Sequence, residues 1–159
     1  MDVDRLLRLA RELVGELMFC VASTHGEDGS ISARIVQPLP LQDNWTVNTI
    51  TNRRCRKVRE IERSGRMTLL YQHDQSKSYV CLMGQAEIVE DVELKRSIWT
   101  SSYDRWNTGG PENPATVFMR LATDRIELWS AAHDVMPPPT GYSAAILLRQ
   151  DDGWRCSAT

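Results

Sequence analysis

The sequence predicts a mainly β protein, an antiparallel barrel that is closed or nearly closed and carries only a few helices. Short apolar runs separated by turn residues recur along most of the chain, as in small β barrels. Helical periodicity appears in only three segments. The chain has 159 residues, of which 42% are hydrophobic and 25% charged. These values suit one globular domain with a sizeable core, so we expect a single domain over residues 1–159.

The three expected helices are short and differ in character. Residues 4–17 place apolar side chains on one face and charged ones on the other, which predicts an amphipathic opening helix. A basic helix over 58–63 is expected to end near Gly65, because glycine readily adopts the left-handed conformation of a helix end. Asp91 is expected to cap a third helix that runs through Trp99.

The expected strands are joined mostly by turns. Asp28-Gly29 predicts a hairpin between the first two strands, and Asp151-Asp152-Gly153 predicts a late hairpin near the end. Strands joined in this way pair antiparallel. The expected strands are 18–24, 31–38, 45–51, 67–71, 79–89, 117–121, 125–130, 142–148 and 154–156.

Charge and cysteine usage exclude several classes of function. The net charge of −2 and pI near 5.9 argue against general affinity for nucleic acid or an anionic membrane. No apolar run is long enough to span a bilayer, and the N-terminus lacks the pattern of a signal peptide. Four scattered cysteines and three isolated histidines give no metal-ligand spacing. We therefore expect a cytoplasmic protein with reduced thiols and no metal, membrane or nucleic-acid partner.

Residues 51–59 concentrate positive charge at one point of the chain. Five of these nine residues are Arg or Lys, and they lie between an expected strand and an expected helix. The amides at a helix N-terminus favour an anion, and Arg and Lys side chains add donors and charge. Charge alone favours a solvated helix face. A bound phosphate is the alternative, and it requires support from other segments.

Three segments together provide that support. They are Arg34-Ile35-Val36, the pair Ile50-Thr51 with Arg56-Lys57 ending six positions after Thr51, and Gly84-Gln85-Ala86-Glu87. This set resembles the FMN-binding split-barrel family typified by pyridoxamine 5'-phosphate oxidase. The resemblance extends over about residues 18–129.

A further likeness narrows the branch of that family. The residues that look like the general-stress-protein branch are Trp99, Trp106, 109–114 and 126–129. The chain departs from that branch at residues 107–108, where Asn-Thr replaces Phe-Pro, and at Asn113, which replaces Asp. These departures lie in the loop formed by residues 106–114, so the resemblance does not define the role of that loop.

The resemblance implies an antiparallel six-stranded split β-barrel with a few flanking α-helices, and a homodimer that holds FMN at the subunit interface. Arg56 and Lys57 would grip the FMN phosphate, and Thr51 would donate a hydroxyl hydrogen bond to it. Arg34 would lie beside the flavin, where a cation raises the redox potential. The implied cofactor-binding residues are Arg34, Ile35, Val36, Ile50, Thr51, Arg56, Lys57, Tyr79, Trp106 and Trp129.

Each aromatic residue in this set has two interpretations, contact with the flavin or packing within the protein. Tyr79 stands where the oxidase commonly has Gln, so it would either bond the flavin through its hydroxyl or only pack against it. Trp129 matches a family Trp that usually reaches the cofactor from the partner subunit. Core packing is the alternative for Trp129 and for Trp106.

One missing element argues against the activity of the oxidase itself. The oxidase carries Arg-x-His shortly after the family Trp, whereas residues 130–137 contain no Arg. The expected function is therefore that of an FMN-dependent oxidoreductase with an unknown small-molecule substrate and no identifiable catalytic side chain. The alternatives are a flavin-binding stress protein without turnover and a deazaflavin-dependent reductase.

Overall fold

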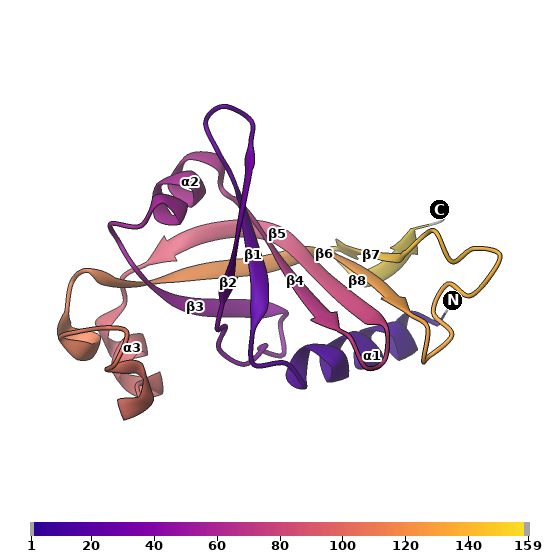
Figure 1. Ribbon diagram of the computed structural model, residues 1–159, viewed down its shortest axis with the longest axis horizontal. Coiled ribbons are helices and arrows are strands. Elements are labelled where there is room, and N and C mark those ends of the chain that lie inside the picture. The colour runs from indigo at the N-terminus through magenta and orange to yellow at the C-terminus, as the bar shows by residue number, and fades with distance from the viewer. Residues whose placement is uncertain (1, 158–159) are drawn as a thin grey trace.

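The strands form one antiparallel sheet whose edges are not joined by strand pairing (Figure 1). The computed structural model describes residues 2–157, and in that part of the chain there are eight strands. Their order is β2-β1-β4-β5-β6-β7-β8, and β3 pairs with β6. The strands are β1 (Cys20–His25), β2 (Ile31–Val36), β3 (Thr46–Asn52), β4 (Arg66–His73), β5 (Ser78–Val89), β6 (Thr116–Ser130), β7 (Ala145–Gln150) and β8 (Gly153–Ser157).

The prediction of a mainly β antiparallel fold is confirmed, but the sheet has eight strands where the resemblance implied six. Strands β7 and β8 form the late hairpin, which turns at Asp151-Asp152 as the sequence predicted. This hairpin extends the sheet from β6 and lies at its far end in Figure 1.

The long strand β6 organises the sheet. Its first half pairs with β3, its second half pairs with β7 on the same side, and β5 lies along its other side. The prediction of two strands, 117–121 and 125–130, is wrong because the chain continues through this region as one strand. A β-bulge lies where the break was expected: Gly84 pairs with Thr123 and Met83 with Arg125, which leaves Asp124 as the additional residue.

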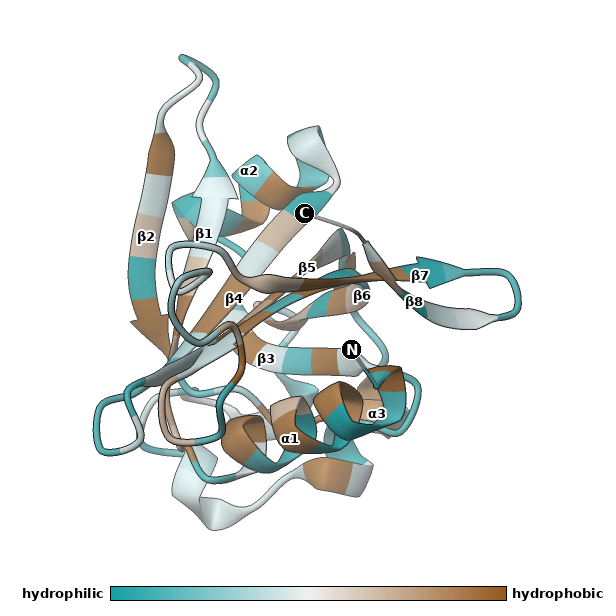
Figure 2. Ribbon diagram, turned by 90° about the vertical axis from the view of Figure 1, so that its right-hand side faces the viewer, coloured by the Kyte–Doolittle hydropathy of each residue, from teal (hydrophilic) through white to brown (hydrophobic). Residues whose placement is uncertain are grey.

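The first helix, α1 (Val3–Gly15), begins where the carboxylate of Asp2 accepts hydrogen bonds from the amides of Asp4 and Arg5. It ends two residues before the predicted boundary. Its apolar side, brown in Figure 2, packs against β4, β5 and β8. The helix therefore covers part of the apolar core of the sheet.

Two shorter helices lie next to segments on which the family resemblance depends. The basic helix α2 (Arg56–Ser64) ends at Gly65, whose φ of 64° is left-handed as predicted. The third helix, α3 (Val92–Ile98), is capped by Asp91 as predicted. Two short 3-10 helices follow it, η1 (Ser101–Tyr103) and η2 (Gly110–Glu112). No helix within residues 2–157 has both the length and the apolar character needed to cross a membrane.

Candidate cofactor site

The junction between β3 and α2 has the backbone features of an anion site. Cys55 occupies the N-cap position of α2, but its side chain makes no capping hydrogen bond. The first-turn amides of α2 therefore receive no side-chain oxygen at that position. The amides at the start of a helix and the positive end of the helix dipole favour an anion there.

A cavity of about 490 Å³ opens beside this junction, and we call it the junction cavity. It lies against the ends of β2 and β3, the start of α2 and the loop that follows α3. Six of the predicted cofactor-binding residues line it, namely Ile35, Val36, Ile50, Thr51, Lys57 and Trp106. The fold thus brings together three segments that are far apart in sequence.

Among the residues that the structure describes, Lys57 is the only cation that lines the junction cavity. It is half-buried, and its side chain forms no ion pair or hydrogen bond with the part of the chain that the structure describes. Its neighbours are engaged: Arg53 pairs with Glu62 and Glu90, and Arg56 pairs with Glu60. An ammonium without a counter-ion is a ready partner for an anion.

Thr49 adds a polar group without a partner. Its hydroxyl is buried and makes no hydrogen bond within residues 2–157, and the residue lines the junction cavity. A buried hydroxyl normally finds a partner, because leaving it unpaired is costly. The hydroxyl of Thr49, the ammonium of Lys57 and the α2 amides therefore fit a ligand with polar, anionic groups.

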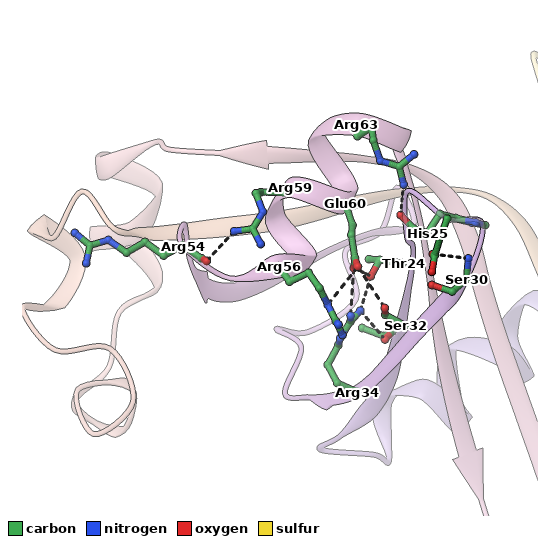
Figure 3. Close-up of polar contacts among 12 residues, drawn as sticks. Thr24, His25, Ser30, Ser32, Arg34, Arg54, Arg56, Arg59, Glu60 and Arg63 are labelled. Atoms are coloured by element: carbon green, nitrogen blue, oxygen red, sulfur yellow. Dashed lines mark hydrogen bonds and ion pairs between the residues drawn. The ribbon is translucent and has the colours of Figure 1, made fainter.

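Arg34 and Arg56 do not line the junction cavity; both guanidiniums contact Glu60 (Figure 3). The Glu60 side chain is only 8% exposed, and its carboxylate also accepts hydrogen bonds from Thr24 and Ser32. The hydrogen bond from Thr24 is the main cause that lowers the pKa of Glu60 below its usual 4.5, and Ser32 and the two guanidiniums add to it.

Sequence reasoning did not identify Glu60. One signal was present, namely the spacing of four residues between Arg56 and Glu60, which allows an ion pair on one helix face. The contacts with Thr24, Ser32 and Arg34 depend on how the β1–β2 hairpin packs against α2, and a single sequence does not show that packing.

Tyr79 and Trp129 lie at a different place. They are directly paired neighbours on β5 and β6, and they line a cavity of about 500 Å³ that shares no residue with the junction cavity. The indole nitrogen of Trp129 is buried without a partner in the described residues. Burial is the main cause that raises the pKa of Tyr79, and Glu127 and Cys81 add to it.

The lining of the junction cavity limits its chemistry. It contains no His, Asp or Glu, and its remaining ionisable side chains are Cys55, Lys57 and Tyr103. Apolar surface from Phe19, Ile35 and several neighbours makes up most of the wall. The cavity can therefore bind an anionic ligand with a flat apolar part, but it offers no carboxylate or imidazole for proton transfer. The described residues contain no group of three or more potential metal ligands.

Comparison with known proteins identifies relatives of this chain. General stress protein 26 of Bacillus subtilis (strain 168) is 32% identical over 92 residues, which cover 56% of this chain and 65% of that protein. The matched region thus spans just under two thirds of this relative.

Solved structures match the fold at low sequence identity. General stress protein 26 from Bacillus anthracis aligns with a TM-score of 0.66 at 24% identity, over 77% of this chain and 92% of that one. A pyridoxamine 5'-phosphate oxidase-related, FMN binding protein from Nostoc punctiforme aligns with a TM-score of 0.69 at 11% identity, over 99% and 94%. PhzG from Burkholderia lata, in complex with tetrahydrophenazine-1-carboxylic acid, aligns with a TM-score of 0.69 at 20% identity, over 98% and 88%.

These alignments confirm the predicted split-barrel fold class. The profile of one protein family, described as pyridoxamine 5'-phosphate oxidase like, matches residues 6–150, nearly the whole chain. Together with the β3–α2 junction and the sheet topology, this match shows that the chain belongs to the pyridoxamine 5'-phosphate oxidase-like family.

Proposed function

We propose that the protein binds FMN in the junction cavity and acts as an FMN-dependent oxidoreductase. The observation that carries this proposal is Lys57, a half-buried residue in the first turn of α2 that lines the junction cavity and makes no ion pair or hydrogen bond within residues 2–157. The description of the Nostoc relative as an FMN binding protein supports the choice of ligand.

Each part of the cavity would have a separate role in holding FMN. Lys57 and the α2 amides would bind the phosphate, and the hydroxyls of Thr49 and Thr51 would bond polar atoms next to it. Ile35 and Trp106 would pack on the flat ring system and exclude water from it. The bound flavin supplies two-electron transfer, and the chain supplies binding and orientation. Residues 130–137 contain no Arg or Lys, so we do not propose a pyridoxal phosphate site there.

The working unit in this proposal is a homodimer. The side chains at the cavity mouth include Ile35, which is 73% exposed, and Trp106, which is 76% exposed. Ile35 lies on β2, an edge strand of the sheet, so apolar surface and an unpaired edge coincide there. A second copy of the chain would cover this surface and would bring its own Tyr79 and Trp129 to the cavity.

Mixing two variants tests the shared site. If each site draws Lys57 from one chain and Trp129 from the other, a mixed dimer of Lys57→Ala and Trp129→Ala chains has one intact site and one doubly altered site. Half of the mixed dimers' sites should then bind FMN normally, although neither parent dimer does. If FMN binding by the mixed dimers stays at the level of the parent proteins, the two residues do not serve one shared site.

A flavin-binding protein without turnover is the second candidate. The absence of His, Asp and Glu from the described lining of the junction cavity favours it, because no imidazole or carboxylate is at hand for proton transfer. Anaerobic mixing of the FMN-loaded protein with NADH or NADPH distinguishes the two. Rapid bleaching of the flavin absorbance indicates an enzyme, and a stable yellow protein indicates a carrier.

Equilibrium titration tests binding itself. The purified protein should quench FMN fluorescence saturably, and the flavin released on heating should co-migrate with FMN. A protein that cannot be loaded with FMN would refute the proposed cofactor, and loading with a deazaflavin would favour a reductase of that kind.

A further inference from the structure

The cluster around Glu60 brings two cations and a carboxylate together beside the junction cavity. The Glu60 cluster consists of Glu60, Arg34, Arg56, Thr24 and Ser32, and Figure 3 shows these side chains converging between α2 and the β1–β2 hairpin. Thr24 Oγ1 donates to Glu60 Oε2 at 2.5 Å, and Ser32 Oγ donates to Oε1 at 3.3 Å. The carboxylate is thus held by side chains from both segments.

The two arginines are held with different strength. Arg34 is 22% exposed, and besides Glu60 it donates to Thr24 Oγ1 at 2.5 Å and to the carbonyl of Ala22 at 3.3 Å. Arg56 is 69% exposed, and its Nε lies 3.3 Å from Glu60 Oε1. Exposed ion pairs within one helix are weak. Arg56 is therefore free to leave Glu60, whereas Arg34 stays as the counter-ion.

Arg56 and Lys57 are consecutive residues, but they line different cavities. Arg56 and Glu60 line a cavity of about 450 Å³ between α2 and the β1–β2 hairpin, whereas Lys57 lines the junction cavity. Consecutive residues on a helix point about 100° apart. Both cations can hold one phosphate at the start of α2 only when Arg56 turns away from Glu60.

We propose that Glu60 is an internal anion that competes with the cofactor phosphate for Arg56 and so lowers the affinity of the protein for a phosphate-bearing flavin. This inference rests on the proposed function. Glu60 remains charged at neutral pH, since its hydrogen bonds and cations favour the ionised form. When Arg56 moves to the phosphate, Arg34 and Thr24 still compensate the carboxylate, so its release does not leave a buried charge unpaired.

Four proteins and two ligands test this role. The proteins are the unaltered chain, Glu60→Gln, Arg56→Ala and the double variant, and the ligands are FMN and riboflavin, which lacks the phosphate. Loss of one exposed competing ion pair should make Glu60→Gln bind FMN about two- to fivefold more tightly. Riboflavin affinity should not change. In the Arg56→Ala background, Glu60→Gln should leave FMN affinity unchanged.

Several results would overturn the inference. They are weaker or unchanged FMN binding by Glu60→Gln, an equal change for riboflavin, and a gain that persists without Arg56. If Glu60→Gln does not fold in a thermal melt, Glu60→Asp retains the charge but withdraws it from Arg56 by one methylene group, and FMN should again bind more tightly than to the unaltered protein. If the unaltered protein binds no FMN, the proposed function fails. That separate result would overturn both the proposed function and the role inferred for Glu60.

Discussion

Replacing Lys57 with Ala isolates the contribution of one cation to flavin binding. A charge-assisted contact between ammonium and phosphate contributes about 1.5–3 kcal/mol. Because Lys57 is only half-buried, we expect the lower part of this range, about 1.5–2 kcal/mol, which weakens FMN binding roughly 10- to 30-fold. Riboflavin carries no phosphate, so its affinity should stay within about twofold.

The same substitution should not destabilise the protein without ligand. Lys57 makes no ion pair or hydrogen bond that Ala would remove, and a cation in the first turn of a helix opposes the helix dipole. Denaturant unfolding should therefore show an unchanged or slightly higher free energy of unfolding.

Arg54→Ala is the matched control for Lys57→Ala, because Arg54 is an exposed cation of the same run that does not line the junction cavity. Fluorescence titrations of the three proteins with FMN and riboflavin provide the comparison. Equal FMN affinity in the Lys57 variant and the Arg54 variant would refute the assignment of the phosphate to this junction. An equal loss for riboflavin would show that the substitution disturbs the cavity as a whole.

Three further predictions concern the fold. Gly84→Ala should cost more than about 3 kcal/mol in urea unfolding, because a Cβ there would lie 2.0 Å from the Ala122 carbonyl oxygen. Burial raises the pKa of Cys20 to about 12, so mass mapping after brief maleimide treatment at about pH 8 should find Cys55 labelled well before Cys20. A carboxyl with a lowered folded pKa stabilises the fold above its usual value of 4.5 and loses this effect as the pH falls below it. Glu60→Gln should therefore flatten the loss of stability in acid, measured as melting temperature against pH.

The parts of the fold that could be predicted are those that depend on residues close together in the sequence. Asp91 and Gly65 act on their own helix ends, so helix capping could be read from the sequence. The continuity of β6 could not be predicted in the same way. Asp124 is typical of turns, yet it lies in a bulge where its carboxylate pairs with Arg66 at 2.7 Å, and that partner is far away in sequence. Such a pairing depends on the order of strands in the sheet.

The same distinction between local signals and long-range packing applies to the residues of the site. Thr51, Lys57 and the start of α2 are neighbours in the chain, so the sequence could indicate a candidate anion site there once Arg34 and Gly84 were considered with them. The partner of Arg34 is Glu60 on another element, and Glu60 on a basic helix looks like an ordinary solvated residue in the sequence. Residues whose roles depend on packing between the hairpin and α2 therefore needed the structure.

Two of the five cations at residues 51–59 are paired with carboxylates in the fold. Arg53 is compensated by Glu62 and Glu90, and Arg56 by Glu60. Compensated cations contribute little field at a distance, and salt screens it further. Among the described residues, Arg54, Lys57 and Arg59 make no ion pair, and of these three only Lys57 lines the junction cavity beside the helix amides. This arrangement favours one small phosphate-bearing ligand at the start of α2 over an extended polymer.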